Sequence, residues 1–144
     1  MFKLKTVIGA SLLAAAATTA FAYSTNPDVQ KRQETMGMIS SGLKKLMPMV
    51  QGKADFDAAT AQAAFAQIAE YAGNIPTAFE ANTTDAESKA SPAIWENWDD
   101  FTTKASALEA GAKAGMGVDS LEAMQAAFGP VGGACKACHT TYKK

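Results

Sequence analysis

Apolar residues recur at helical spacing in four stretches of the chain. The first stretch runs from about Pro27 to Val50 and the second from about Asp57 to Ala72. The third begins at Ser91 and ends at Gly115, and the fourth runs from about Asp119 to Tyr142. Steps of three and four residues place side chains on one face of a helix. The pattern therefore predicts four amphipathic helices.

Each predicted helix has an apolar stripe that would face a common core. The stripes contain Val29, Met36, Ile39, Leu43, Leu46 and Val50, then Ala61, Phe65, Ile68 and Ala72, then Ile94, Trp98, Phe101, Ala105, Leu108 and Ala112, and finally Leu121, Met124, Phe128, Val131, Cys135, Cys138 and Tyr142. Arg32 falls on the first stripe, where a buried charge needs a partner. Four such helices with mostly short connections predict an all-α, antiparallel up-down four-helix bundle.

Turn-forming residues separate the predicted helices. Asn26 is suited to cap the first helix, and Ser91 to cap the third. The stretch 75–91 contains Pro76 and several Asn and Thr residues, which predicts a long loop. Gly129-Pro130 interrupts the fourth helix, where we expect a kink.

The first 22 residues have the features of a secretory signal peptide. Lys3 and Lys5 precede a mostly apolar run, and Ala20-Phe21-Ala22 is a small-x-small cleavage site. The apolar run is short for a membrane span, although an uncleaved anchor is the alternative. We therefore expect residues 1–22 to be removed after Ala22 and residues 23–144 to be a single domain in the periplasm without a stable membrane anchor.

The charge of the expected mature domain is slightly negative. Of 13 basic and 14 acidic residues, two lysines lie in the predicted signal, which leaves 11 basic against 14 acidic residues. The sequence shows no basic patch of the size that nucleic acid requires. Nucleic-acid binding is therefore not expected.

The chemistry of the chain is concentrated in Cys135-Lys136-Ala137-Cys138-His139, a CxxCH motif. It contains both cysteines and the only histidine of the sequence. CxxCH is the attachment motif of c-type haem: the thiols form thioether bonds, and the imidazole is an axial ligand of iron. A zinc site would need four ligands, and the chain has no further Cys or His. A redox CxxC would be expected beside a βαβ pattern, which the sequence does not show. A disulfide in a haem-free bundle stays as an alternative, but the motif predicts one covalent haem c.

Several further segments resemble the class II c-type cytochromes, specifically cytochrome c′. The resemblance is carried by Arg32-Gln33 with Met36, Pro76 with Phe79, the segment 92–95, and the segment from Phe128 to Lys143. It covers essentially all of residues 23–144. It implies a homodimer packed through the first two helices. Because no acid–base pair is visible around the motif, we do not expect the protein to be an enzyme.

The resemblance also implies roles for individual residues. Cys135 and Cys138 would anchor haem, His139 would be the proximal ligand, and Lys143 would lie near that histidine. Met36 would cover the distal side, and Phe79 would line the distal pocket. Arg32 and Gln33 would contact the haem propionates, with Ser88 and Lys89 as further candidates. One departure is Thr77, where some relatives have tryptophan, so the distal wall is expected to be less closed.

Two functional hypotheses follow for a haem-bearing bundle. In the first, His139 is the only protein ligand of a five-coordinate iron, and the protein binds NO or CO and transfers electrons to or from a redox partner protein. In the second, Met36 is the sixth ligand of a low-spin electron carrier. Met36 could also simply pack in the core, so three roles stay open for it at this point.

Overall fold

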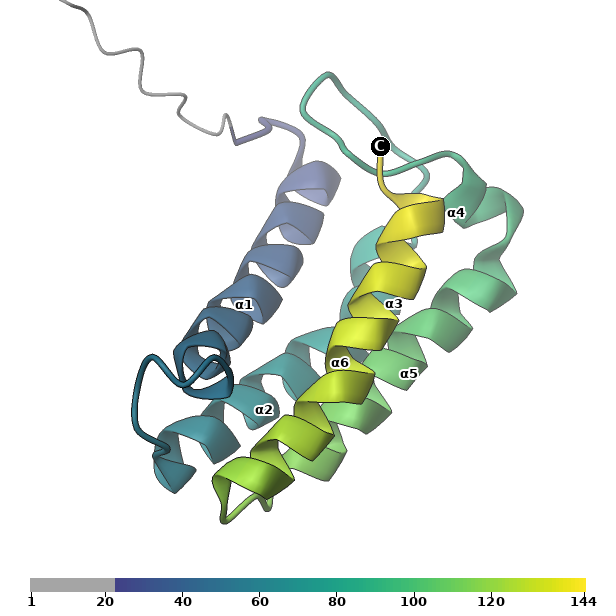
Figure 1. Cartoon of the computed structure of the whole chain (residues 1–144). Helices are drawn as coiled ribbons and strands as arrows, with labels where there is room; N and C mark the ends of the chain where they lie inside the picture. The colour runs from purple at the N-terminus through teal and green to yellow at the C-terminus, as the bar shows by residue number, and fades with distance from the viewer. Residues whose placement is uncertain (1–22) are drawn as a thin grey trace, which may run out of the picture.

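The computed structural model describes residues 23–144, and the predicted signal peptide with its cleavage site lies outside these residues. Six helices are present in the described part: α1 (Pro27–Val50), α2 (Ala58–Gly73), α3 (Ile75–Phe79), α4 (Ala93–Glu96), α5 (Trp98–Gly115) and α6 (Leu121–Tyr142). The long helices α1, α2, α5 and α6 form an antiparallel bundle (Figure 1). None of the helices described is long and apolar enough to cross a membrane.

The interfaces between the four long helices differ in how closely they pack. The successive pairs α1–α2, α2–α5 and α5–α6 make extensive contacts, whereas α1 and α6 contact each other sparsely. One contact between them is a hydrogen bond from Gln125 Nε2 to the Val50 carbonyl, 3.3 Å long. It lies at the end of the bundle where α1 ends and α6 begins (Figure 1). The bundle is thus tightly packed on three sides and loosely packed on the fourth.

Polar side chains fix where the long helices begin. Asn26 Oδ1 accepts hydrogen bonds from the amides of Asp28 and Val29, at 2.9 and 3.3 Å. Asp57 and Ser120 cap α2 and α6 in the same way. Such caps satisfy amides that have no partner inside the helix. The bounds of α1 match the prediction, and those of α2 and α6 differ from it by one or two residues.

Two predictions, one about the 75–91 loop and one about the third helix, are wrong. The stretch 75–91 begins with a short helix, α3, because Pro76 fits a first helical turn and Ile75 and Phe79 are buried. The predicted third helix is divided at Asn97, whose φ of −131° and ψ of 50° are not helical. The Asn97 side chain donates to the Ala93 carbonyl at 3.2 Å, and this side-chain bond competes with continuation of the helix.

The core contains most of the predicted stripes. The largest fully buried side chains are Phe65, Phe101, Leu46, Ile68, Ile94, Met124, Val29 and Val131. Burial of each contributes about 1.5–3 kcal/mol. Leu121 is 38% exposed, so its assignment to the core is wrong, because it lies in the first turn of α6 beyond the packed part of the bundle. Helix α6 continues through Gly129 and Pro130 without interruption.

Candidate haem site

The two cysteines occupy a partly uncovered section of the core-facing stripe of α6. Val131 and Tyr142, on either side of them along this stripe, are 0% and 4% exposed. Cys135 and Cys138 are half-buried free thiols that pack against the core. Burial raises the pKa of both thiols, because a thiolate is poorly solvated there. The cysteines therefore face an apolar region that the protein itself covers incompletely.

Helix α1 shows the same alternation on the opposite side of the loosely packed interface. Ile39 and Leu46 are buried, whereas Met36 and Leu43 are only partly buried, although all four belong to one predicted stripe. Half-buried apolar side chains thus lie on the core-facing stripes of both helices that flank the sparse interface. This arrangement fits a large apolar group attached to α6, so the residues present are suited to hold haem.

Helix geometry places Met36 and His139 at the same height in the bundle. The bond between Gln125 and Val50 aligns α6 with α1, and the two helices run in opposite directions (Figure 1). His139 follows Gln125 by 14 residues, and Met36 precedes Val50 by 14 residues. At 1.5 Å per residue, both lie about 21 Å from that bond along the bundle. Met36 is therefore level with the predicted proximal ligand, on the helix across the loose interface.

His139 has an environment that favours the form able to bind iron. The His139 side chain is exposed, but its partial desolvation lowers the pKa of the imidazole, and the nearby positive charge of Lys143 lowers the pKa further. A neutral imidazole has a free nitrogen lone pair, whereas an imidazolium has none. The sequence of α6 thus supplies both thiols and a neutral imidazole within two helical turns.

Arg32 is 3% exposed, and its guanidinium group donates several hydrogen bonds to protein acceptors. Its Nε donates to the Ala78 carbonyl at 3.3 Å, and its Nη1 donates to the Thr83 carbonyl at 2.7 Å. Its Nη2 also donates to Thr83 Oγ1, at 3.2 Å, and to a further carbonyl of the same segment, that of residue 81. The resemblance to cytochrome c′ implies a haem propionate as partner, and in the structure backbone carbonyls of 78–83 bind this guanidinium.

Aromatic rings complete the surroundings of Arg32. The guanidinium carbon lies 5.3 Å from the ring centre of Phe79 and 5.0 Å from that of Trp95. Phe79 itself is buried and packs against Phe101, with 5.3 Å between ring centres. Burial lowers the pKa of Arg32, and the charges of Asp28 and Asp85 oppose that shift. Arg32 therefore connects α1 to the segment that follows α3.

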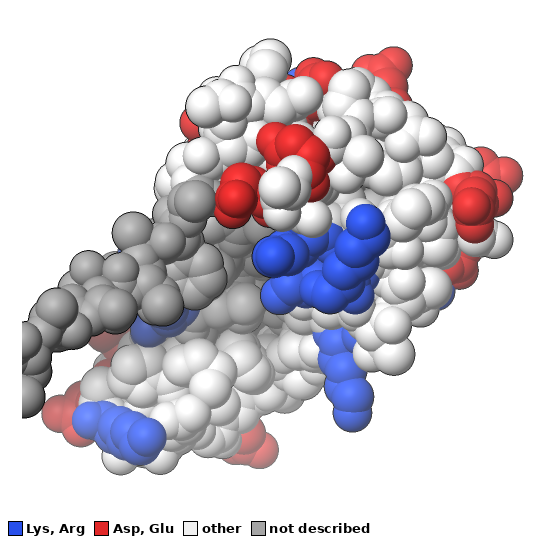
Figure 2. All heavy atoms as spheres, turned by 90° about the horizontal axis from the view of Figure 1, so that it is seen from above, with Lys and Arg blue, Asp and Glu red and all other residues white. Residues whose placement is uncertain are grey.

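The remaining candidate residues lie at the end of the bundle where α6 finishes. Gln33 Oε1 accepts from the Ser24 amide at 3.1 Å, and the hydroxyl of the buried Ser88 accepts from the Ala90 amide at 3.4 Å. The Lys89 carbonyl accepts from the Lys144 amide at 2.8 Å. This pairing brings Lys89 next to Lys143, and Figure 2 shows basic side chains gathered on this end of the molecule.

Thr77 lines an open hollow of about 490 Å³ beside α3 and α5. Its other lining residues are Pro76, Glu80, Trp95 and Trp98. Trp95 donates its indole N–H to the Phe79 carbonyl at 2.8 Å. Trp98, which the sequence pattern assigned to the core, is only half-buried and forms one wall of this hollow.

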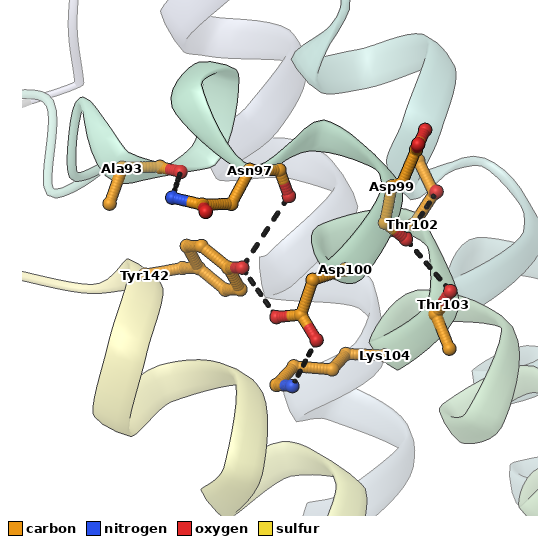
Figure 3. A network of polar contacts seen from close by, with 8 residues as sticks. All are labelled: Ala93, Asn97, Asp99, Asp100, Thr102, Thr103, Lys104 and Tyr142. Carbon is orange, nitrogen blue, oxygen red and sulfur yellow. Dashed lines mark hydrogen bonds and ion pairs between the residues drawn. The ribbon is translucent and has the colours of Figure 1, made fainter.

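A polar network that joins α5 and α6 was not predicted from the sequence (Figure 3). Tyr142 donates its hydroxyl proton to Asp100 Oδ2 at 2.5 Å, and Lys104 Nζ lies 2.8 Å from Asp100 Oδ1. The bond from Lys104 and the bond from Tyr142 lower the pKa of Asp100, while the Asp100 carboxylate raises the pKa of Tyr142 to about 12. The spacing of Asp100 and Lys104 signals their pairing, but nothing in the sequence identifies Tyr142 as the third member.

Together, the bundle and the motif on its last helix define a class of protein, a helical c-type haem protein. Comparison with known families agrees with this class. The sequence model described as Cytochrome C′ matches residues 28–143, so the chain belongs to the cytochrome c′ family. Members of this family are haem proteins without enzymatic activity, and membership implies a covalent haem c at Cys135 and Cys138.

Individual relatives support the same assignment. Cytochrome c-556 from Agrobacterium tumefaciens (strain II Chrys) is 38% identical over 120 residues, which cover 81% of this chain and 96% of that protein. The structure of cytochrome c′ from Rhodopseudomonas palustris matches with a TM-score of 0.78 at 29% identity, covering 83% of this chain and 97% of that one. The nitric oxide complex of a mutant cytochrome c′ from Alcaligenes xylosoxidans matches with a TM-score of 0.67 at 33% identity, covering 81% and 93% of the two chains. The predicted family and four-helix fold are confirmed.

Proposed function

We propose that this protein is a periplasmic haem protein that binds NO and CO at a five-coordinate iron and also exchanges electrons with a redox partner protein. The observation that carries the proposal is the placement of Met36 level with His139 across the α1–α6 interface. A bulky apolar side chain at that level would crowd the side of a bound haem that faces away from His139. Crowded apolar surroundings disfavour water and anions and leave room for small neutral ligands. A mutant of a related cytochrome c′ forms a nitric oxide complex, which supports the choice of ligand.

Different residues of the chain would attach haem, bind its iron and contact its propionates. Cys135 and Cys138 would form the thioether bonds, and His139 would bind iron through its neutral imidazole. Haem iron supplies the binding site for gaseous ligands and the capacity to carry one electron. Gln33, Ser88 and Lys89 would lie near the propionates, and Arg32 would hold the 78–83 segment through its bonds to backbone carbonyls. Phe79 would lie on the distal side, and Lys143 beside His139.

A second candidate is a low-spin electron carrier in which the thioether sulfur of Met36 binds the iron. The level position of Met36 suits this role as well, because a ligand must face the iron from the side opposite His139. Some relatives are named cytochrome c′ and others cytochrome c-556. The cytochrome c-556 noted above shares 38% identity with this chain. Bonding by Met36 would raise the reduction potential of the haem.

Absorption spectra of the ferric and ferrous protein, recorded with and without NO, distinguish the two candidates. We expect high-spin spectra in both oxidation states and a large change when NO is added. Met36→Ala should stay high-spin and should bind NO faster, because the sixth position is then less crowded. Low-spin spectra that become high-spin in Met36→Ala would reject the five-coordinate proposal in favour of methionine ligation.

The mass of the exported protein tests both haem-bearing candidates at once. Covalent haem adds about 600 Da to the polypeptide. We expect this increment on a chain that begins at Tyr23, in agreement with cleavage after Ala22. A mass without the increment, and lower than that of the dithiol chain by two hydrogen atoms, would instead indicate a haem-free bundle with a disulfide between Cys135 and Cys138.

We further propose that the protein is a homodimer packed through α1 and α2. On the outer surface of these helices, Met38 is 38% exposed and its carbonyl accepts a 2.7 Å bond from Gln67. An exposed methionine is an adaptable contact for a second copy. Light scattering should give twice the monomer mass, and Met38→Lys should reduce it to the monomer value.

A further inference from the structure

Three exposed lysines come together at the end of the bundle where α6 finishes. We call Lys89, Lys143 and Lys144 the C-terminal lysine patch. Backbone hydrogen bonds hold its two segments side by side: the Lys144 amide donates to the Lys89 carbonyl at 2.8 Å, and the Ser91 amide donates to the Tyr142 carbonyl at 2.9 Å. Figure 2 shows basic side chains gathered at this end, with acidic side chains beside them. The position of the patch is therefore fixed by the fold.

The charges of the patch form no ion pair within the part of the chain that the structure describes, and Lys144 has no role in the proposed haem site. Within residues 23–144, the ion pairs are those of Lys104 with Asp100 and of Lys113 with Glu109, so no lysine of the patch takes part in one. The domain as a whole has more acidic than basic residues. The patch is thus a local reversal of the overall charge, and such a reversal orients an approaching acidic molecule.

The patch also adjoins the motif that carries haem. The Lys143 amide donates to the His139 carbonyl at 3.3 Å, and the Lys143 charge acts on the His139 imidazole. A molecule bound to the patch would consequently lie beside the last turn of α6.

We propose that the C-terminal lysine patch docks the acidic face of a one-electron carrier protein. DNA and membranes are the alternative partners of a basic patch, but three lysines are few for either. Proteins that bind DNA through phosphates commonly use about 6–10 contacts, and membrane-binding segments use about 4–8 basic residues. A protein interface needs only a few steering charges at its rim. The choice of an electron carrier as occupant rests on the proposed haem function, whereas the preference for an acidic face rests on the charges alone.

The test is a binding titration of the haem-loaded protein with an acidic plant-type ferredoxin as a model partner. At about 10 mM salt, where charges act over about 30 Å, we expect binding that shifts the amide resonances of residues 89, 143 and 144. Lys144→Glu should weaken binding about 5-fold or more, and Lys144→Arg should preserve it. At about 1 M salt, where the range falls to about 3 Å, the difference between the variants should disappear.

Lys53→Glu is the matched control, because it makes the same change of net charge on an exposed residue between α1 and α2. It should weaken ferredoxin binding less than 2-fold. Equal effects of the two reversals, shifts confined to other residues, or binding only to phosphatidylglycerol vesicles would each overturn the inference. The absorption spectrum and NO binding of the same samples report on the proposed function separately: normal haem with no patch-dependent binding rejects only the docking inference.

Discussion

At the scale of single residues, His139 has the clearest proposed role, that of axial ligand of the haem iron. It lies directly after Cys138, and partial desolvation together with the charge of Lys143 lowers the pKa of its imidazole. Both effects favour the neutral form that binds iron, so the environment and the motif agree. The thiols and the imidazole have separable roles, because attachment uses sulfur and ligation uses nitrogen.

We predict that His139→Ala keeps covalent haem but loses the proximal bond. The mass should retain the increment of about 600 Da, while the ferric and ferrous spectra change and return toward those of the native protein when imidazole is added. His139→Ala spectra identical to those of the native protein would show that the axial assignment is wrong.

Tyr142 and Asp100 lead to a prediction about pH. The Asp100 carboxylate raises the pKa of Tyr142 to about 12, from about 10 in an unfolded chain. Between these values the folded state keeps a proton that the unfolded state has lost. The contribution of Tyr142 to stability is therefore complete below pH 10 and is lost as the pH rises toward 12.

Asp100→Asn should return the titration of Tyr142 toward about 10, because the negative acceptor is gone. The measurement is the ultraviolet absorbance of tyrosinate against pH, with Tyr142→Phe as the control that identifies the signal. If Asp100→Asn leaves the delayed titration in place, the bond between these side chains is not its cause.

Arg32 and Tyr142 illustrate how much of the site could be predicted at this scale. The apolar stripe predicted that the Arg32 charge needs a partner, and the structure provides several carbonyls. Which groups these are depends on the path of segment 78–83, and no periodic pattern determines that path. The Tyr142–Asp100 bond likewise depends on how α5 and α6 are aligned, so it could be found only from the fold.

At the scale of elements, the α1–α2 interface depends on a small residue. A methyl group at Gly42 would lie 2.7 Å from Ile68 Cγ1 and 3.1 Å from the Ala64 carbonyl oxygen. Ile68 is fully buried and is branched at Cβ, so it has few other conformations. The two helices can approach this closely only because Gly42 has no side chain.

We predict that Gly42→Ala destabilises the protein by about 1–3 kcal/mol, since overpacking forces the helices apart. Gly37 lies in the same helix with no neighbouring atom within 4 Å, so Gly37→Ala should stabilise the helix by about 0.5–1 kcal/mol. Urea unfolding at a constant m value measures both changes. Effects of the same sign in the two variants would contradict the proposed close packing at Gly42.

Long elements were predictable and short ones were not. The 24 residues of α1 carry a cap and several repeats of the stripe, and its bounds were predicted correctly. The five residues of α3 are too few to show a period, and their helix forms because Ile75 and Phe79 gain burial against the bundle. The break at Asn97 was missed for a related reason, because the stripe continues on both sides of it.

At the scale of the whole molecule, three tight interfaces and one loose interface give the bundle an incomplete core. Covalent haem is present in the folded and the unfolded chain alike, so it cannot stabilise the fold by mass action as a dissociable ligand does. Its contribution must come from burial of its apolar surface in the folded state. The half-buried Met36, Leu43, Cys135 and Cys138 mark where that surface would be buried.

We therefore predict that the Cys135→Ser/Cys138→Ser double variant, which cannot attach haem, forms a loose bundle. It should keep helical circular dichroism, unfold over a broad range of temperature and bind a dye specific for exposed apolar surface. Cys135→Ser alone retains one thiol for attachment and serves as the control, with a sharper transition than the double variant. A cooperative, sharp transition in the double variant would mean that α1 and α6 close on each other and complete the core without haem, and the loose interface would then have no role in holding it.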